Sequence, residues 1–133
     1  RVWEKGDQIT LYFPMSVEKM QSHPKVRENA GKIALQRGPI VYCLEEIDNG
    51  SNLSAISLPL NSEFEAVFEP NLLNGVMTIT GKAGRVKETN WDDQLYKSVG
   101  DEVESVTIRA IPYYAWCNRE PGEMIVWIRS TID

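Results

Sequence analysis

The strongest constraint on the fold of this chain is a hydrophobic period of two residues. In residues 62–70, "SEFEAVFEP", the apolar side chains of Phe64, Ala66 and Phe68 alternate with glutamates. Successive side chains of a β-strand point to opposite faces of the sheet, so this period indicates a strand with one buried and one solvated face. Residues 7–13, "DQITLYF", show the same alternation.

Eight segments carry this period or a compact β-rich run, and none shows a sustained helical period of 3.6 residues. We expect strands at residues 7–13, 33–35, 40–46, 55–60, 62–70, 75–83, 105–116 and 123–130. Short strands separated by turn residues are typical of an antiparallel β-sandwich. The sequence therefore predicts an all-β fold, an antiparallel β-sandwich of about eight strands with little or no helix, in one domain over residues 1–133.

Three local features refine this prediction. Pro59 cannot donate to a strand ladder, which favours an edge position for residues 55–60. Residues 16–29 are polar and indicate a crossing connection, with at most one helical turn before Pro24. Residues 84–104 form a long connection of a kind that is often functional or packed against another part of the protein.

Composition excludes several classes of partner. The formal net charge is -5, so we expect no nucleic-acid partner, and no apolar run is long enough to cross a membrane. The two cysteines, Cys43 and Cys117, lie in strand-like apolar surroundings and are interpreted as unpaired buried thiols, with a disulfide between them as the alternative. With His23 as the single histidine, a structural zinc site is not expected.

The residues do not predict a catalytic site. A glycosidase needs two carboxyl groups across one pocket, whereas Glu45 and Glu46 are neighbours in a predicted strand and should point to opposite faces. The doublet Asp92-Asp93 falls in the long loop and is interpreted as a solvated turn. A couple between Cys117 and the distant His23 has no support in the pattern.

Aromatic side chains leave carbohydrate binding open, since flat rings with adjacent planar polar groups recognise sugars. The candidates for a sugar or domain-interface contact are Trp91, Tyr113, Tyr114 and Trp116, whereas Trp127 is assigned to the core. Pro112 breaks the strand register before the tyrosines. If Ile108 and Ala110 face the interior, then Ile111 faces the other way.

The polar residues after these aromatics are assigned to the shoulder of a terminal hairpin. Pro121-Gly122 matches the centre of a type II turn, with a positive φ at the glycine. The planar groups of Asn118 and Arg119 would then hydrogen-bond loop carbonyls or a docked domain.

Two long blocks, "GKIALQRGPIVYCLEEIDN" and "AIPYYAWCNREPGEMIVWI", preceded by "KGDQITLYFPM", resemble the C-terminal region of glycoside hydrolase family 127, which includes bacterial β-L-arabinofuranosidases. The matching residues are Gly6, Asp7, Pro14, Met15, Ala34, Leu35, Arg37, Gly38, Pro39, Val41, Tyr42, Cys43, Glu45, Pro112, Tyr113, Tyr114, Trp116, Asn118, Arg119, Met124, Val126 and Trp127.

The resemblance implies a division of labour within a longer protein. A helical toroidal barrel would carry the active site, with a cysteine as nucleophile and a glutamate as acid/base. A zinc ion beside the nucleophile would be held by further cysteines and another glutamate. None of those barrel residues has a counterpart here, and Cys43 and Cys117 match positions in the β-sandwich of the family. The resemblance therefore implies that the chain itself holds no active site and no cofactor. Residues 1–25 could be shared with a preceding β-sandwich.

The resemblance therefore implies a non-catalytic C-terminal accessory domain that supports the catalytic barrel or mediates contacts in a homodimer. The alternative is a carbohydrate-binding module for arabinose-containing glycans that uses the exposed aromatics. The resemblance implies a bacterial protein and leaves the compartment open, either cytoplasmic or periplasmic and secreted.

Overall fold

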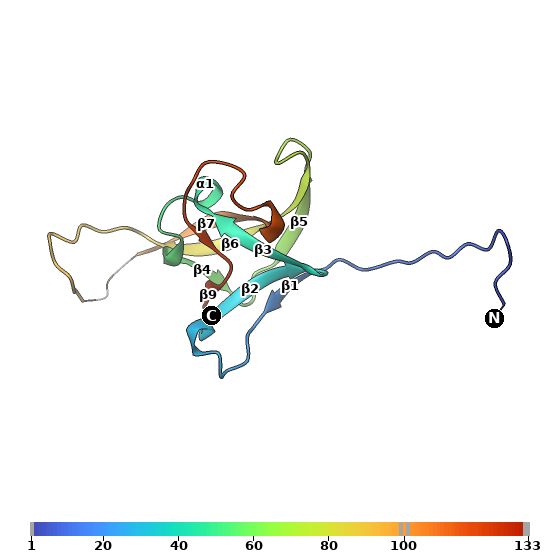
Figure 1. Cartoon of the computed structure of the whole chain (residues 1–133). Helices are drawn as coiled ribbons and strands as arrows, with labels where there is room; N and C mark the ends of the chain where they lie inside the picture. Colours follow the sequence, from blue (N-terminus) through green and yellow to red (C-terminus); the bar gives the residue numbers. More distant parts are fainter. Residues whose placement is uncertain (1, 99, 101, 132–133) are drawn as a thin grey trace.

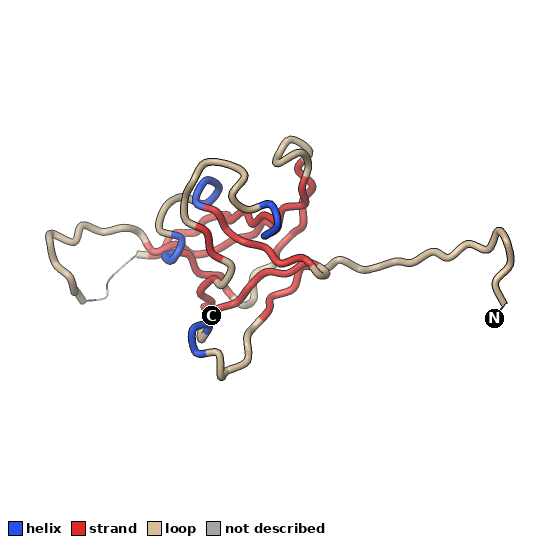
Figure 2. The backbone as a smooth tube through the Cα atoms, in the orientation of Figure 1, coloured by secondary structure: helices blue, strands red, loops and turns tan. Residues whose placement is uncertain are grey.

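A computed structural model describes residues 2–98, 100 and 102–131 of the chain. The described part is almost entirely strand and loop (Figure 2). Its strands are β1 (Val17–Met20), β2 (Lys32–Arg37), β3 (Ile40–Glu45), β4 (Ile56–Pro59), β5 (Phe64–Glu69), β6 (Val76–Val86), β7 (Val103–Pro112), β8 (Met124–Ile125) and β9 (Ile128–Thr131). Its helical turns are α1 (Glu46–Asn49) and the 3-10 turns η1 (Arg27–Asn29), η2 (Leu53–Ala55) and η3 (Tyr113–Ala115).

Six strands close into a barrel (Figure 1). The ring runs β2-β9-β4-β6-β7-β3 and returns to β2, and every one of these neighbours is hydrogen-bonded. The other three strands extend the ring: β1 pairs with β2, β5 with β6 and β8 with β3. The all-β prediction is confirmed, but the specific prediction of an antiparallel sandwich is not, because the sheet is closed and β4 runs parallel to β9.

Closure depends on a strand that is shared among three partners. The first residues of β2, Lys32 and Ile33, pair with β9, whereas its last residues, Gln36 and Arg37, pair with β3. A two-residue period is the same in an open and a closed sheet, so it cannot reveal this sharing. The edge position expected from Pro59 is also wrong, because β4 lies between β6 and β9 and the proline is its last residue.

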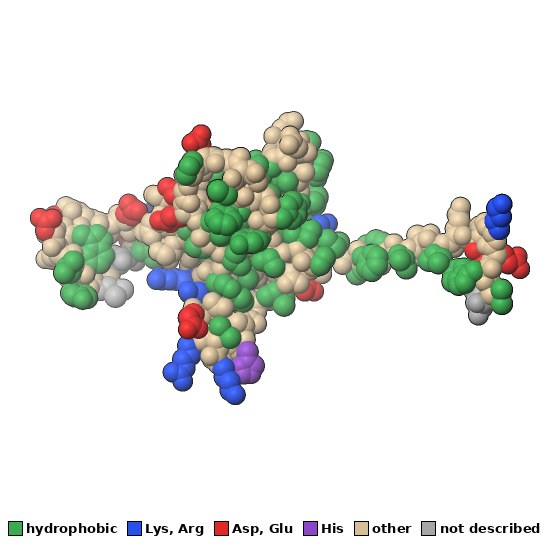
Figure 3. Space-filling view, viewed as in Figure 1, with side chains coloured by type: hydrophobic (Ala, Val, Ile, Leu, Met, Phe, Trp, Pro, Cys, Tyr) green, Lys and Arg blue, Asp and Glu red, His purple; other side chains and the backbone are tan. Residues whose placement is uncertain are grey.

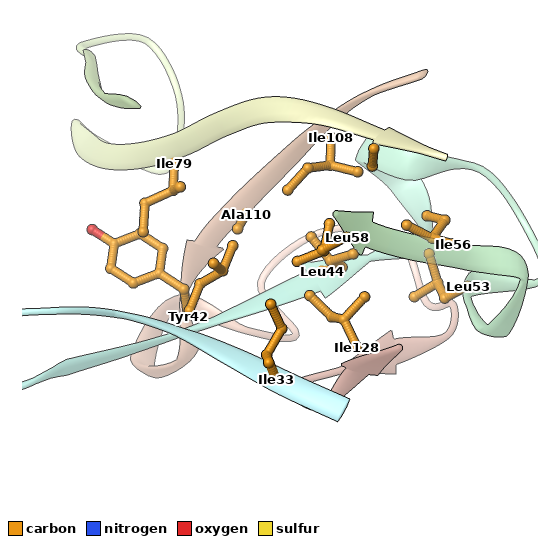
Figure 4. Close-up of a cluster of buried hydrophobic side chains, with 12 residues drawn as sticks. Ile33, Tyr42, Leu44, Leu53, Ile56, Leu58, Ile79, Ile108, Ala110 and Ile128 are labelled. Carbon is orange, nitrogen blue, oxygen red and sulfur yellow. The ribbon is translucent and has the colours of Figure 1, made fainter. Parts of the chain in front are cut away.

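The interior of the barrel is filled by aliphatic side chains and the ring of Tyr42 (Figure 4). The members of this main core are Ile33, Leu35, Tyr42, Leu44, Leu53, Ile56, Leu58, Ile79, Ala83, Ile108, Ala110 and Ile128. A smaller cluster of Cys43, Ile111 and Ala115 lies on the other face of β3 and β7. The predicted alternation along β7 is therefore confirmed, since Ile108 and Ala110 enter the barrel and Ile111 enters the second cluster.

The assignment of Trp127 to the core is wrong. This residue lies between β8 and β9, is partly exposed and belongs to neither buried cluster. It lines a surface hollow of about 350 Å³ together with Val41 and Val126.

Two segments project from the barrel in opposite directions (Figure 1). Residues 2–16 extend away from β1 without joining a strand, so the strand expected at residues 7–13 is not formed within this chain. The long loop that follows β6 is the second projection, as the sequence predicts. Among the described residues, no helix has the length and apolar character to cross a membrane.

Candidate functional site

The aromatic residues singled out by the sequence lie where β7 ends. Residues 113–119, called the aromatic corner below, begin at the 3-10 turn η3 (Tyr113–Ala115), whose Ala115 is buried in the second cluster. The side chains of Tyr113, Tyr114 and Trp116 are 45%, 71% and 41% exposed. The rings of Tyr113 and Trp116 stack, with centroids 5.9 Å apart and an interplanar angle of 23°. The corner thus presents a flat aromatic surface to solvent.

The corner is tied to the barrel by a cluster of charged side chains. The Arg119 guanidinium donates from Nη2 to Glu45 Oε1 at 2.9 Å and to Asp48 Oδ2 at 2.5 Å, and from Nη1 to Asp48 Oδ1 at 3.0 Å. Arg109 extends the cluster, with Nη1 3.4 Å from Asp48 and Nε 3.3 Å from Glu69. A two-pronged guanidinium–carboxylate contact fixes orientation as well as distance, so the corner has one position relative to α1 and β3.

Because the side chains of this ion-paired cluster are largely buried, the cluster strongly constrains the position of the corner. The side chains of Glu45 and Asp48 are each 6% exposed, and that of Arg119 is 16% exposed. The hydrogen bond to Asp48 raises the pKa of Arg119 above its ordinary value, burial opposes this rise, and the bond to Glu45 adds to it. Charges out of water require partners, and here each buried carboxylate has one.

The backbone of the corner is held in an uncommon conformation. Cys117 has a φ of 65°, and its N–H donates to Glu45 Oε2 at 3.4 Å. The Asn118 side chain donates to the carbonyl oxygens of Ala115 at 2.9 Å and Trp116 at 3.3 Å. A left-handed residue other than glycine persists where the surrounding contacts determine it, and such residues concentrate at functional surfaces.

The chain beyond the corner does not form the predicted hairpin. Gly122 does not take the positive φ that a type II turn requires, and β8 pairs with β3. Glu46 holds this segment instead, because its carboxylate accepts from the Glu123 N–H at 2.8 Å and its own N–H donates to the Glu123 carbonyl at 2.9 Å. A Cβ on Gly122 would lie 2.9 Å from the Glu46 Cβ, so close approach is what requires glycine here.

A shallow groove of about 460 Å³ borders the corner. Its walls are the turn between β5 and β6 and one side of the corner, and its lining residues are Leu73, Asn74, Gly75, Val76, Tyr114, Ala115 and Asn118. None of these side chains carries a formal charge, although a quarter of the chain's residues are charged. The groove therefore offers amide groups and one phenol ring, which suits a neutral polar ligand.

The structure does not bring the other predicted aromatic to the corner. Trp91 lies in the loop that precedes β7, whereas the corner follows β7, and a ten-residue strand spans roughly 30 Å. Its ring is 47% exposed, and the ammonium of Lys97 lies 4.5 Å from the ring centroid. Trp91 is therefore a separate surface feature.

The two cysteines differ in their surroundings. Both are free thiols, as the leading interpretation expects. Cys43 is buried, and burial raises the pKa of its thiol to about 12. Cys117 is exposed, so its predicted place in the core is wrong, because it follows the turn η3 and does not continue the strand.

Sequence reasoning found Arg119 but missed its partners. It expected Arg119 to bond loop carbonyls or a docked domain, whereas the partners are Glu45 and Asp48. An available signal was the acidic spacing in "EEID", which places two carboxylates on one side of a helical turn after β3. In the described part of the chain, no three His, Cys, Asp or Glu side chains are grouped so that they could hold a metal ion.

A domain of this fold also occurs in solved glycoside hydrolases. The family model described as the glycoside hydrolase family 127 C-terminal domain matches residues 17–129, and the chain belongs to this family. A curated relative, the non-reducing end β-L-arabinofuranosidase of Bifidobacterium longum subsp. longum, is 37% identical over 127 residues. That match covers 92% of this chain and 19% of the relative.

Solved structures of family 127 enzymes are also similar to this chain. The GH127 β-L-arabinofuranosidase Ara127N from Geobacillus stearothermophilus T6 is 59% identical, with a TM-score of 0.85 over 90% of this chain and 19% of that one. A second GH127 β-arabinofuranosidase is 35% identical, with a TM-score of 0.78 over 90% of this chain and 18% of that one. The chain therefore spans about a fifth of the length of these relatives.

Proposed function

We propose that this chain is the C-terminal accessory domain of a longer hydrolase resembling the β-L-arabinofuranosidases, and that it supports that protein's catalytic helical barrel. The observation that carries the proposal is the family match over residues 17–129, combined with a span of 19% of the relatives' length. Hydrolysis of the glycosidic bond then belongs to the rest of the polypeptide.

The buried cysteine, Cys43, supports a non-catalytic role. A nucleophilic cysteine needs a lowered pKa and access to substrate, whereas Cys43 is buried with a pKa raised to about 12. The zinc ion that the resemblance implies also finds no fitting donor set in the described part of this chain. We place both the nucleophile and the zinc in the barrel.

The aromatic corner is the surface that we assign to contact with the rest of the protein. Tyr, Trp and Arg dominate the energetics of protein interfaces, and the corner combines Tyr113, Tyr114 and Trp116 with the ion-paired Arg119. Because buried ion pairs already fix its backbone, little entropy is lost when a partner covers it. The partner is the helical barrel of the same polypeptide, or a second copy if the protein forms a homodimer.

Separate production of this chain and of the remaining polypeptide tests the proposal. We expect the two parts to associate, and we expect Tyr113→Ser with Trp116→Ser to weaken association by about 30-fold, the loss of one interface hot spot. Tyr96→Ser, which removes an 89% exposed aromatic from the loop after β6, is the matched control. If the unaltered parts do not associate at micromolar concentrations, the proposed role is wrong.

Carbohydrate binding is the second candidate, and the uncharged groove beside the stacked Tyr113–Trp116 pair favours it. Sugar rings pack on aromatic faces and hydrogen-bond to amide groups like those of Asn74 and Asn118. Calorimetric titration with arabinose-containing oligosaccharides should give heat that Trp116→Ser and Asn74→Ala abolish. Absence of heat at millimolar ligand removes this candidate.

A further inference from the structure

An asparagine is followed directly by a glycine twice in this chain, at Asn49-Gly50 and at Asn74-Gly75. Asparagine is one of the thermally labile residues of proteins. In an Asn-Gly pair the backbone nitrogen of the glycine can attack the side-chain amide carbon of the asparagine, because glycine has no Cβ to obstruct the approach. The structure places the two pairs in different environments, and this difference determines which pair can react.

The side chain of Asn49 is held by three hydrogen bonds. Its Nδ2 donates to the carbonyl oxygens of Glu45 at 3.0 Å and Arg109 at 2.9 Å, and its Oδ1 accepts from the Arg109 N–H at 2.9 Å. These bonds fasten the last residue of α1 to β7. The amide carbon of Asn49 can turn toward the Gly50 nitrogen only after they break.

The side chain of Asn74 is not restrained in this way. It lies exposed in the turn between β5 and β6, which projects from the barrel (Figure 1), and in the described part of the chain no hydrogen bond joins it to another group. The turn is also strained, since Leu73, Asn74 and Gly75 follow one another with φ of 48°, 63° and 98°. A left-handed conformation is unfavourable for a bulky residue such as Leu73, so little free energy is lost when this turn opens.

The two attacking nitrogens, by contrast, are restrained alike. The Gly75 N–H donates to the Leu72 carbonyl oxygen at 2.8 Å, and the Gly50 N–H donates to the Glu46 carbonyl oxygen at 2.7 Å. The difference in reactivity therefore comes from the asparagine side chains and from the strain of the turn.

We propose that Asn74 is a site of spontaneous deamidation, whereas Asn49 is protected in the folded chain. The Gly75 nitrogen forms a bond to Asn74 Cγ, the Cγ–Nδ2 bond breaks, and ammonia leaves with the proton that the Gly75 nitrogen loses. Water then opens the cyclic imide and leaves aspartate or, where the backbone C–N bond is the one that breaks, isoaspartate. Nothing is oxidised or reduced, and water is the co-reactant.

Deamidation places a negative charge in the groove beside the aromatic corner. Asn74 lines that groove with Tyr114 and Asn118, and none of the lining side chains is charged. The turn itself, residues 70–75, is uncharged, and Figure 3 shows neither an acidic nor a basic side chain at its tip. The new carboxylate therefore has no cation in the groove to pair with, and the groove no longer suits a neutral ligand.

Peptide mass spectrometry of the folded 133-residue chain, incubated at pH 8, tests the inference without any variant. We expect Asn74 to deamidate about 100-fold faster than Asn49, because three hydrogen bonds that each contribute a factor of about five must break at Asn49. In urea, where neither pair is folded, the two rates should become similar. Anion-exchange chromatography should resolve an acidic fraction that grows with time and elutes with fresh Asn74→Asp. The matched variant Asn74→Gln should give no such fraction.

Three outcomes overturn the inference. The first is equal deamidation of Asn49 and Asn74 in the folded chain, because the hydrogen bonds then give no protection. The second is a folded chain in which neither pair reacts although both react in urea, because the turn then does not open. The third is an acidic fraction that persists in Asn74→Gln, because the charge then arises elsewhere. The proposed function rests on the family match and stands in each of these cases.

Discussion

Replacing Arg119 with methionine should destabilise the isolated domain by about 3 kcal/mol. Removal of one member of a buried ion pair typically costs roughly 3–5 kcal/mol, because the remaining charge is left out of water without a partner. Glu45 and Asp48 are both 6% exposed, so both would lose a hydrogen-bonded cation. The lower end of this energy range applies because Asp48 keeps Arg109 at 3.4 Å and Glu45 keeps the hydrogen bond from the Cys117 N–H.

Urea and thermal unfolding followed by circular dichroism would measure this loss. For a domain of this size, about 3 kcal/mol corresponds to a fall of roughly 10 °C in the unfolding midpoint. Arg27→Met, on the exposed 3-10 turn η1, is the matched control and should change the stability by less than about 0.5 kcal/mol. In a double-mutant cycle, Asp48→Asn should cost much less in the Arg119→Met background than in the unaltered protein. Equal losses for Arg119→Met and Arg27→Met would refute the reasoning.

Two further predictions concern a buried thiol and a turn. Because burial raises the pKa of Cys43 to about 12, the native state keeps its proton when the unfolded state has lost it. The free energy of unfolding should therefore fall between about pH 9 and pH 12, and Cys43→Ala should flatten that fall in urea titrations. At pH 8 a small thiol reagent should label the folded chain once, at Cys117; two labels would contradict the burial of Cys43. Gly38→Ala should cost about 1–2 kcal/mol, because φ is 55° and a Cβ would collide with the Met15 side chain, whereas Gly100→Ala has no neighbour to displace. Equal unfolding midpoints for these two variants would contradict the turn geometry.

The strands could be predicted where the local pattern decides them. Alternation in residues 62–70 predicted β5, and the strand expected at residues 75–83 corresponds to the first part of β6. The segment at residues 7–13 has equally clear alternation, yet it pairs with no strand among the described residues. The short strand β1 was missed because its two apolar residues, Val17 and Met20, are three positions apart in a polar segment and do not fit a two-residue period.

The closure of the barrel and the support of the corner depend on contacts between distant residues. The sharing of β2 among β1, β3 and β9 has no local signal: Gln36 and Arg37 pair with β1 on one side and with β3 on the other, whereas Lys32 and Ile33 pair with the distant β9. The bond between Arg119 and Asp48 joins residues 71 positions apart. Sequence could identify the aromatics and Arg119 as unusual, and the spacing in "EEID" indicates two carboxylates on one side of a turn, but no local pattern links those carboxylates to the distant guanidinium.

The most direct test of the central claim is the thermal stability of the full-length protein with and without this domain. If the domain is an accessory support, removal of residues 17–133 should shorten the half-life of the proposed β-L-arabinofuranosidase activity at elevated temperature. Addition of the 133-residue chain in trans should restore that half-life, and the chain alone should hydrolyse no β-L-arabinofuranoside. Unchanged activity and half-life after removal of the domain would contradict the account.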